Sequence, residues 1–259
     1  RGYLGPRGKA FVYNHGIGTL ALCEALCFSD SSRLRWGAKR ALDVVSLARN
    51  PYGAWRYEVP PNGDNDTSVT AWMLQALWTG ELAGLKVRRD GYTGGANWID
   101  EVTDPATGRV GYDAMGSLSA RVPGKNMEFP HDKGEAMTGA GLFCRYLLGQ
   151  RAEEDRAGIL TKHADLLGRQ LPEWDPDGFD VDYYYWYYGS QAMWQAQGRG
   201  WDAWSKALRK ALLDSQRQDG DERGSWDTVS AWSYACGRVG TTALAVLALQ
   251  APYRYEILE

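Results

Sequence analysis

The sequence is poor in the residues that build metal and redox sites, with four cysteines and three histidines among 259 residues. The cysteines form no Cys-x-x-Cys pair, and Cys23 and Cys27 lie four apart within an apolar run, which favours buried thiols. No stretch approaches the roughly 18 apolar residues of a membrane span. Basic residues are scattered and the net charge is −3, which argues against a nucleic-acid interface. These absences predict a soluble globular protein with no nucleic-acid partner and no cofactor.

Phenylalanine is also scarce, with five residues against twelve tryptophans and fifteen tyrosines. Aromatic rings that carry a polar atom suit wet cavities and helix contacts better than a purely apolar core. The chain begins at Arg1 without a methionine or a signal-peptide pattern. We therefore expect a fragment or a processed form, whose compartment the sequence leaves open.

Five apolar segments with helical periodicity recur along the chain, each opening on a polar or glycine-containing turn. They cover residues 15–27, 66–78, 134–148, 182–195 and 238–249. Aligning them brings five hydroxyl residues into one register, with spacings of 51, 68, 52 and 52 residues: Thr19, Thr70, Thr138, Ser190 and Thr242. A long inserted loop over residues 105–133 accounts for the wide spacing. We predict that these hydroxyls lie at one level and bond back to the preceding helical turn.

Segments with one charged face alternate with the apolar ones, at residues 33–49, 96–103, 152–169 and 201–216. A single hairpin cannot bury its own apolar face, so neighbouring hairpins must stack. The alternation predicts an all-α fold, an α/α toroid of about 4.5 hairpins with an inner and an outer ring of helices, in one domain over residues 1–259. Since a closed ring of this class needs more hairpins, we expect an N-terminal helical segment to be missing.

The loops after two outer segments are related to each other. Arg49 precedes Gly53-Ala54-Trp55 in one loop, and Gln216 precedes Gly224-Ser225-Trp226 in the other, with a degenerate third copy over residues 98–112. This pattern resembles the QW repeat of the prenyltransferase and squalene-oxidase repeat superfamily, in which a glutamine and a Gly-x-Trp tie neighbouring hairpins together. The runs at residues 62–70, 184–189 and 237–244 are similar to those of planctomycete-type bacterial repeat proteins of unassigned reaction. The resemblance implies a toroid like those of terpenoid cyclases and protein prenyltransferases, and implies fold rather than chemistry.

Squalene-type cyclases carry the motif Asp-x-Asp-Asp-Thr, whose third residue protonates an alkene. Laid on residues 63–67, this motif places Asn65 at the position of the acid, and an amide cannot deliver a proton. Asp64, after a slip of one residue, and Asp66 are therefore the candidate catalytic residues of this segment. The alternative is that Asp66 or Asp64 caps the helix that begins here.

Protein prenyltransferases hold zinc through an aspartate, a cysteine two residues later and a histidine from a later helix. Asp182 matches the aspartate, but Tyr184 stands at the cysteine's position and no histidine follows His163. Because such a site needs its thiolate and imidazole, we predict no catalytic zinc. Asp182 stays a third candidate catalytic residue.

The aromatic run over residues 183–188 is the densest chemical feature. In a toroid the starts of the inner helices face the central cavity, so we expect some of these rings, Trp186 above all, to line that cavity rather than the core. An ion pair between Asp66 and Arg238 is the simpler alternative, as is a structural role for His15. The candidate ligand-binding residues are His15, Trp72, Glu135, Tyr184, Tyr185, Trp186, Tyr188 and Arg238.

Three classes of function fit these residues. An apolar isoprenoid-like or lipid-like ligand, bound and converted or only bound, would use aromatic walls whose faces stabilise cations. A carbohydrate-active lyase or hydrolase would need paired carboxylates, for which Asp64, Asp66, Glu135 and Asp182 are available. A non-catalytic protein-interaction module would use the loop at residues 105–133. We favour the first class, with an apolar small molecule as the expected partner and a protein partner as the alternative.

Overall fold

The computed structural model describes residues 2–51 and 53–258, whose regular secondary structure is helical, with no β-strand among them. They form two compact units, Arg1–Thr103 with Tyr112–Met115 (unit 1) and Asp104–Gly111 with Gly116–Glu259 (unit 2). The helices are α1 (Phe11–Cys27), α2 (Ser32–Leu47), α3 (Thr67–Leu82), α4 (Arg89–Glu101), α5 (Ala136–Leu147), α6 (Ile159–Arg169), α7 (Tyr183–Ala196), α8 (Gly198–Ser215), α9 (Ser233–Leu249) and α10 (Ala251–Arg254), with 3-10 turns η1 (His131–Lys133) and η2 (Ala152–Glu154). The predicted all-α class is confirmed, and the single domain stays a prediction.

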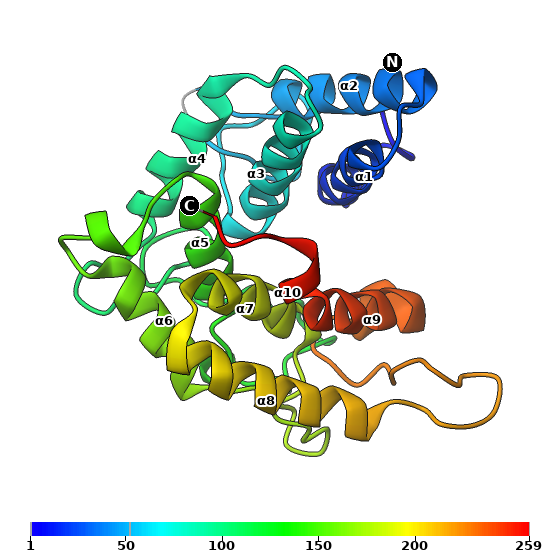
Figure 1. Cartoon of the computed structure of the whole chain (residues 1–259), viewed down its shortest axis with the longest axis vertical. Coiled ribbons are helices and arrows are strands. Elements are labelled where there is room, and N and C mark those ends of the chain that lie inside the picture. The colour runs from blue at the N-terminus through cyan, green and yellow to red at the C-terminus, as the bar shows by residue number, and fades with distance from the viewer. Residues whose placement is uncertain (1, 52, 259) are drawn as a thin grey trace. The chain divides into compact units, whose positions relative to one another are not determined.

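Helices α1, α3, α5, α7 and α9 correspond to the predicted inner segments, and α2, α4, α6 and α8 to the outer ones. In unit 1, α1 lies beside α3, with α2 and α4 packed against them (Figure 1). In unit 2, α7 packs against both α5 and α9, and α6 and α8 cover the α5–α7 pair (Figure 1). The alternation of apolar and one-faced segments therefore gives the hairpin order correctly.

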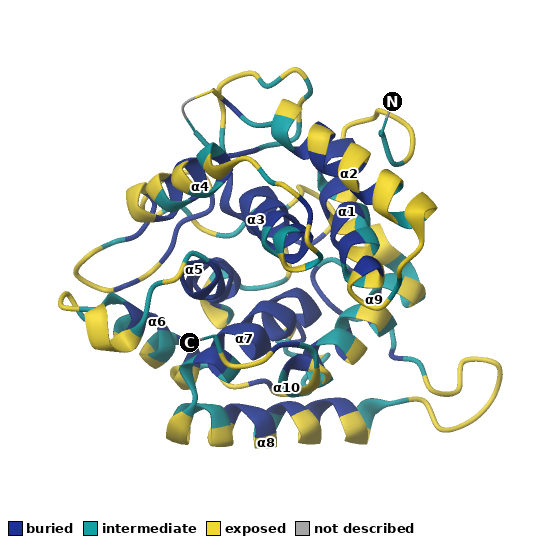
Figure 2. Ribbon diagram, turned by 45° about the horizontal axis from the view of Figure 1, so that its top comes forward, coloured by how far each residue is buried: buried dark blue, intermediate teal, exposed yellow. Residues whose placement is uncertain are grey.

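Burial separates the two kinds of helix (Figure 2). Every residue of α5 is buried, and so is nearly every residue of α7. Helix α8 instead buries one face, through Trp204, Leu208, Ala211 and Leu212, which recur with the helical period. The core of unit 2 thus lies around α5 and α7, with α8 as a one-sided cover.

Four helices start four or more residues from the predicted position: α1 at Phe11 instead of residue 15, α6 at Ile159 instead of residue 152, and also α4 and α9. Glycine lies at the difference in α4 and α9. Helix α4 begins at Arg89, ahead of the predicted residue 96, although three glycines lower its helix propensity. A Cβ atom at Gly94 would lie 2.2 Å from the carbonyl oxygen of Gly53, so glycine lets a loop pack directly on this helix. Helix α9 begins at Ser233 and is kinked at Gly237, whose φ of 59° and ψ of −171° are not helical.

The related loops after α2 and α8 fold alike. The indole Nε1 of buried Trp55 donates to the carbonyl of Val45 at 2.8 Å, and that of Trp226 donates to Leu212 at 2.8 Å. Each loop tryptophan is therefore fastened to the end of the helix that precedes it.

The residue before each loop makes the same contact despite its different identity. Arg49 Nη1 donates to the carbonyl of Gly53 at 3.1 Å, and Gln216 Nε2 donates to the carbonyl of Gly224 at 2.9 Å. Arginine thus takes the place of the glutamine that the first loop lacks.

Three of the five aligned hydroxyls receive these loops. The backbone N–H groups of Trp55, Val110 and Trp226 donate to Thr70, Thr138 and Thr242 at 3.3, 3.2 and 3.3 Å. Ser190 accepts from the indole of Trp204, and Thr19 bonds back to the carbonyl of His15 as predicted. The third loop is fastened through Val110, whereas the sequence placed its Gly-x-Trp equivalent at Gly111-Tyr112.

Residues 102–130 contain no helix, in agreement with the predicted long loop. Part of this stretch, Tyr112–Met115, belongs to unit 1, and most of the rest belongs to unit 2. Among the residues that the structure describes, no helix has the length and apolar character needed to cross a bilayer.

Candidate functional site

Asp66 lies at the start of α3 and is completely buried. Its backbone is extended, and its Oδ1 atom accepts a hydrogen bond from the backbone N–H of Val69 at 2.7 Å. This is the geometry of an N-cap, in which a side-chain oxygen satisfies an unpaired N–H of the first turn. The capping alternative is therefore correct for Asp66, and it uses one of the two carboxylate oxygens.

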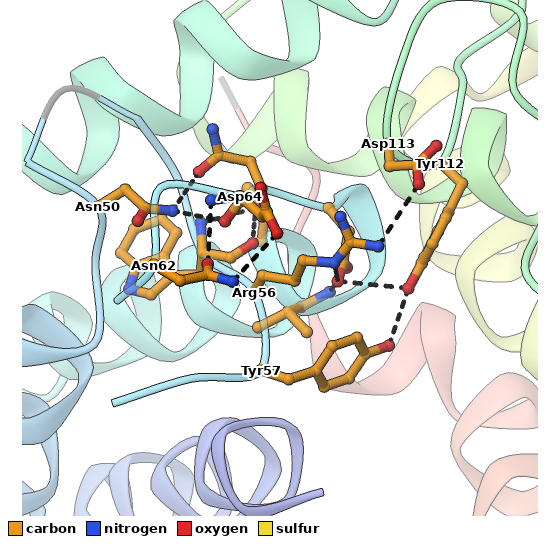
Figure 3. A network of polar contacts seen from close by, with 12 residues as sticks. Asn50, Arg56, Tyr57, Asn62, Asp64, Tyr112 and Asp113 are labelled. Atoms are coloured by element: carbon orange, nitrogen blue, oxygen red, sulfur yellow. Dashed lines mark hydrogen bonds and ion pairs between the residues drawn. The ribbon is translucent and has the colours of Figure 1, made fainter. Parts of the chain in front are cut away.

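The other oxygen of Asp66, Oδ2, lies beside Tyr112 and Arg56, and Figure 3 shows these two side chains close to Tyr57 and Asp113. The hydroxyl of Tyr112 lies 3.4 Å from Oδ2, and Nε of Arg56 lies 3.9 Å from it. Tyr112 is bonded in turn to the hydroxyl of Tyr57 at 3.0 Å, and Arg56 also reaches Asp113 at 3.4 Å. We call Asp66, Arg56, Tyr57, Tyr112 and Asp113 the Asp66 network.

Backbone bonds position the parts of this network. The N–H of Asp66 donates to the carbonyl of Trp55 at 2.8 Å, which brings Arg56 and Tyr57 beside the start of α3. The N–H of Thr67 donates to the carbonyl of Tyr112 at 2.8 Å, which brings the loop after α4 to the same place. The backbone N–H groups at the start of α3 thus hold two loops around one carboxyl.

Burial raises the pKa of Asp66 to about 7, although the Val69 N–H, Arg56 and Tyr112 all favour the charged form. Burial, followed by the charge of Asp66, also raises the pKa of Tyr112 to about 12 and that of Tyr57 further. At neutral pH both phenols therefore keep their protons, while the carboxyl is partly protonated. A carboxylic acid with a pKa near the working pH can donate a proton or a hydrogen bond.

Asp64 and Asn65 have other roles. The side chain of Asp64 is exposed and accepts from the Asn62 amide at 3.0 Å. Asn65 Oδ1 accepts from the Asn50 amide at 2.7 Å and from the N–H of Ala54 at 2.9 Å. Of the three polar residues in the acid-motif region, only Asp66 is both protonatable and buried, so it is the stronger catalytic candidate.

His15 is buried with both ring nitrogens in use. Nε2 donates to the carbonyl of Ala41 at 3.0 Å, and Nδ1 accepts from the N–H of Leu4 at 3.2 Å. Burial lowers its pKa, which suits the neutral tautomer that these two bonds need. This arrangement fits the structural alternative. Trp72, also in unit 1, is buried. Its ring makes a T-shaped contact with that of Tyr13, with the ring centroids 6.2 Å apart.

In unit 2, Asp182 caps α7 and is likewise buried. Its Oδ1 accepts from the N–H groups of Tyr184 and Tyr185, both at 3.0 Å. Burial raises its pKa, and Arg121 from the long loop opposes that shift. Within the described ranges 2–51 and 53–258, no group of three or more His, Cys, Asp or Glu side chains is arranged to hold a metal ion, and the absence of catalytic zinc stays a prediction.

The aromatic run of α7 is packed inside unit 2, contrary to the expectation for Trp186. Trp186 is 1% exposed, and its ring centroid lies 5.3 Å from that of Tyr183. The ring centroids of Tyr184 and Tyr188 lie 5.1 Å apart. Tyr185 stands edge-on against Trp204 of α8 at 5.4 Å. The reason is that α7 has neighbours on several sides, which leaves its rings in the core; a role of these rings toward a ligand stays a prediction.

Glu135 and Arg238 fasten loops. Glu135 Oε1 accepts from Arg109 Nη2 at 2.6 Å, and its Oε2 accepts from Thr138 at 2.8 Å. Arg238 pairs with Asp227 and Glu222, both at 2.9 Å. The alternative in which Arg238 pairs with Asp66 stays a prediction.

A groove of about 380 Å³ also lies on unit 1, away from the Asp66 network. It runs between α2, the end of α3 and the segment before α4. Its lining contains none of the residues predicted from the sequence: Leu42, Asp43, Ser46, Leu47, Leu77, Lys86, Val87 and Arg88.

No family model matches this sequence, and no curated protein matches it. Among solved structures, the chain is similar to the type II terpene cyclase MstE from Scytonema. A variant of that cyclase with merosterolic acid A, its product, is 14% identical, with 90% of this chain and 86% of that chain covered and a TM-score of 0.41. A variant with geranylgeranyl dihydroxybenzoate, its substrate, is 13% identical, with 92% and 87% covered and a TM-score of 0.38. The ligand-free cyclase is 14% identical, with 80% and 70% covered and a TM-score of 0.34.

Proposed function

We propose that this protein binds an apolar, isoprenoid-like ligand and that Asp66 is the acid that acts on it. The observation that carries the proposal is the fully buried Asp66 carboxyl, whose pKa lies near 7 and whose Oδ2 atom accepts from Tyr112, which is bonded in turn to Tyr57. A buried neutral carboxyl can transfer its proton to a carbon of a double bond, which leaves a carboxylate and a carbocation. The proton donor would then be the fourth residue of the acid-motif region rather than the third.

The aromatic side chains around Asp66 support a cationic centre in the ligand. The guanidinium of Arg56 already lies over the ring of Tyr112, 5.8 Å from its centroid. Ring faces stabilise cations through their quadrupole, and they do so more strongly away from water. A carbocation formed next to Asp66 would find the same kind of support, while the apolar part of the ligand packs on aromatic surface.

The test combines ligand binding with conversion, using farnesol as the probe and the full chain. We expect saturable calorimetric binding by the wild type and a new isomer of the probe by gas chromatography. Asp66→Asn keeps the helix cap, because asparagine caps as well as aspartate, but it cannot give up a proton. It should therefore bind farnesol and form no new isomer. Conversion by the wild type should decrease as pH rises through about 7, since the carboxyl loses its proton there.

Asp182→Asn is the matched control, because Asp182 is also a buried N-cap. This variant should bind and convert farnesol as the wild type does. Failure of the wild type to bind farnesol saturably would overturn the ligand class. Equal conversion by Asp66→Asn and the wild type would overturn the role of Asp66.

One observation favours a carbohydrate-active enzyme as a second candidate. Arg56 contacts both Asp66, at 3.9 Å, and Asp113, at 3.4 Å, so two carboxyls lie around one guanidinium. Glycoside hydrolases use a pair of carboxyls, one protonated and one ionised, that flank the scissile glycosidic bond. Saturable binding of an acidic oligosaccharide, lost in Asp113→Asn, would favour this candidate over the isoprenoid one.

A further inference from the structure

A buried acid that gives up its proton must recover it before the next turnover. Asp66 has no exposed surface, and its Oδ1 atom accepts the N–H of Val69. The titratable side chains beside its other oxygen, Oδ2, are Tyr112 and Arg56. Arginine keeps its proton at all ordinary pH values, so Arg56 is not a carrier.

The phenol groups offer a continuous path instead (Figure 3). The Tyr112 hydroxyl lies 3.4 Å from Asp66 Oδ2 and 3.0 Å from the Tyr57 hydroxyl. Tyr112 is buried, whereas Tyr57 is only half-buried and stands on the loop that follows Trp55. A phenol hydroxyl donates one hydrogen bond and accepts others, so it can pass a proton on without losing its own.

We propose that Tyr112 and Tyr57 form the route by which the Asp66 carboxylate takes up a proton from solvent. In this step the Tyr112 proton moves to Asp66 Oδ2, the Tyr57 proton moves to Tyr112, and a solvent hydronium gives its proton to Tyr57. One O–H bond forms on Asp66, one is lost from hydronium, and both phenols end as they began. No electrons are transferred. The role as a proton route in catalysis rests on the proposed function, whereas the exchange itself does not.

The electrostatic surroundings of the two phenols favour transfer of the protons in one concerted step. Arg56 lies against Asp66 and Asp113, and Asp64 adds a further negative charge to its surroundings. Burial and the charge of Asp66 raise the pKa values of both phenols, so neither becomes a stable phenolate on the way. The protons must therefore move together, and loss of either hydroxyl breaks the path.

The test follows protonation of Asp66 without any ligand, after a rapid drop in pH. The carboxyl C=O band in the infrared reports the protonated acid, and Asp66→Asn identifies the band by removing it. In Tyr57→Phe we expect protonation of Asp66 to slow by about tenfold or more, a modest effect for one positioned proton carrier. The pH at which Asp66 is half protonated should not change. In Tyr112→Phe protonation should slow similarly, and the pH of half protonation should rise, because Tyr112 favours the carboxylate.

Tyr92→Phe is the matched control, since its hydroxyl donates to Glu81 at 3.0 Å elsewhere in unit 1. Its protonation rate should equal that of the wild type. If a phenylalanine variant does not fold, the wild-type rate in mixtures of H₂O and D₂O decides, because several moving protons give a curved dependence on deuterium content. Unchanged rates in both variants, or a linear dependence, would overturn the route. If farnesol does not bind while the rates change as expected, only the proposed function fails.

Discussion

Helices α3 and α7 begin in the same way but in different surroundings. Each starts at a buried aspartate whose Oδ1 accepts backbone N–H groups, Asp66 from Val69 and Asp182 from Tyr184 and Tyr185. Burial raises the pKa of both carboxyls. Around Asp66, the phenol of Tyr112 bonds to the carboxyl and to the phenol of Tyr57. Beside Asp182, the Tyr185 hydroxyl donates to the carbonyl of Gln170 at 2.8 Å.

The difference shows what separates a cap from a candidate acid. Capping uses one carboxylate oxygen, and the partner of the second oxygen decides what else the group can do. In unit 1 the second oxygen of Asp66 joins a chain of hydroxyls that ends at the half-buried Tyr57. In unit 2 the helix start leads into a packed aromatic core.

The largest effect should come from that core. We expect Trp186→Ala to lower the free energy of unfolding by about 3–5 kcal/mol, because it empties the site of a buried tryptophan. Chemical denaturation followed by circular dichroism measures it. Trp36→Ala on α2 is the control, since Trp36 is 63% exposed and its loss should cost about 0.5 kcal/mol or less. A similarly small loss at Trp186 would restore its predicted role as a contact surface.

The order of the hairpins could be predicted because apolar periodicity and loop spacing are local properties of the sequence. Glycine limited the accuracy of the boundaries. Gly94 lowers helix propensity yet lies inside α4, where close contact with Gly53 requires it, and Gly237 produces a kink that looks like a helix end in sequence. At Gly94 packing between distant residues overrides the local preference, whereas at Gly237 the backbone itself leaves the helical conformation.

The candidate site was only partly predictable for a similar reason. Asp66 carries a signal, because an acidic residue before an apolar run is a typical cap. Its partners Arg56, Tyr57, Tyr112 and Asp113 come from two loops, which have no periodicity to reveal which side chains meet. Tyr112 was read instead as part of a degenerate repeat, whereas the loop is fastened through Val110. The alternation of apolar and one-faced segments in the sequence also does not show how many neighbours a helix has. The burial of the aromatic rings of α7 on several sides was therefore not predictable.

The second effect is a pH dependence of stability. The folded-state pKa of Asp66 lies above its unfolded value, so the stability from its protonated form is present below about pH 4 and lost as pH rises through about 7. Between pH 5 and 8 the unfolding free energy of the wild type should fall by about 2–3 kcal/mol relative to Asp66→Asn. Denaturation at several pH values measures this. Asp182→Asn should show a difference of the same sign, and parallel curves for Asp66→Asn and the wild type would contradict the raised pKa.

A smaller loss of stability should follow from removing the N-cap, the feature that the starts of α3 and α7 share. Replacing either aspartate by alanine removes the cap, whereas asparagine keeps it, so each alanine variant should be less stable than its asparagine counterpart by about 1 kcal/mol. Denaturation at pH 5, where the carboxyl of Asp66 is mostly protonated, limits the contribution of its charge. A difference confined to one site would mean that the two caps are not equivalent.

The smallest effect should come from Asp64, the neighbour that a one-residue slip of the acid motif would select. Its side chain is exposed and bonded to Asn62, and the loop is held mainly through its backbone, whose carbonyl accepts from Asn50 at 2.6 Å. Asp64→Asn should therefore change the unfolding free energy by about 0.5 kcal/mol or less. It should also leave the infrared band of protonated Asp66 and the conversion of farnesol as they are in the wild type. The reason is that the Asp64 carboxyl is exposed to water, whereas the Asp66 carboxyl is fully buried. The matched comparison is Asp66→Asn, two residues away and equal in chemistry. Loss of conversion in Asp64→Asn with normal conversion in Asp66→Asn would move the acid to Asp64, and would leave Asp66 as a cap of the same kind as Asp182.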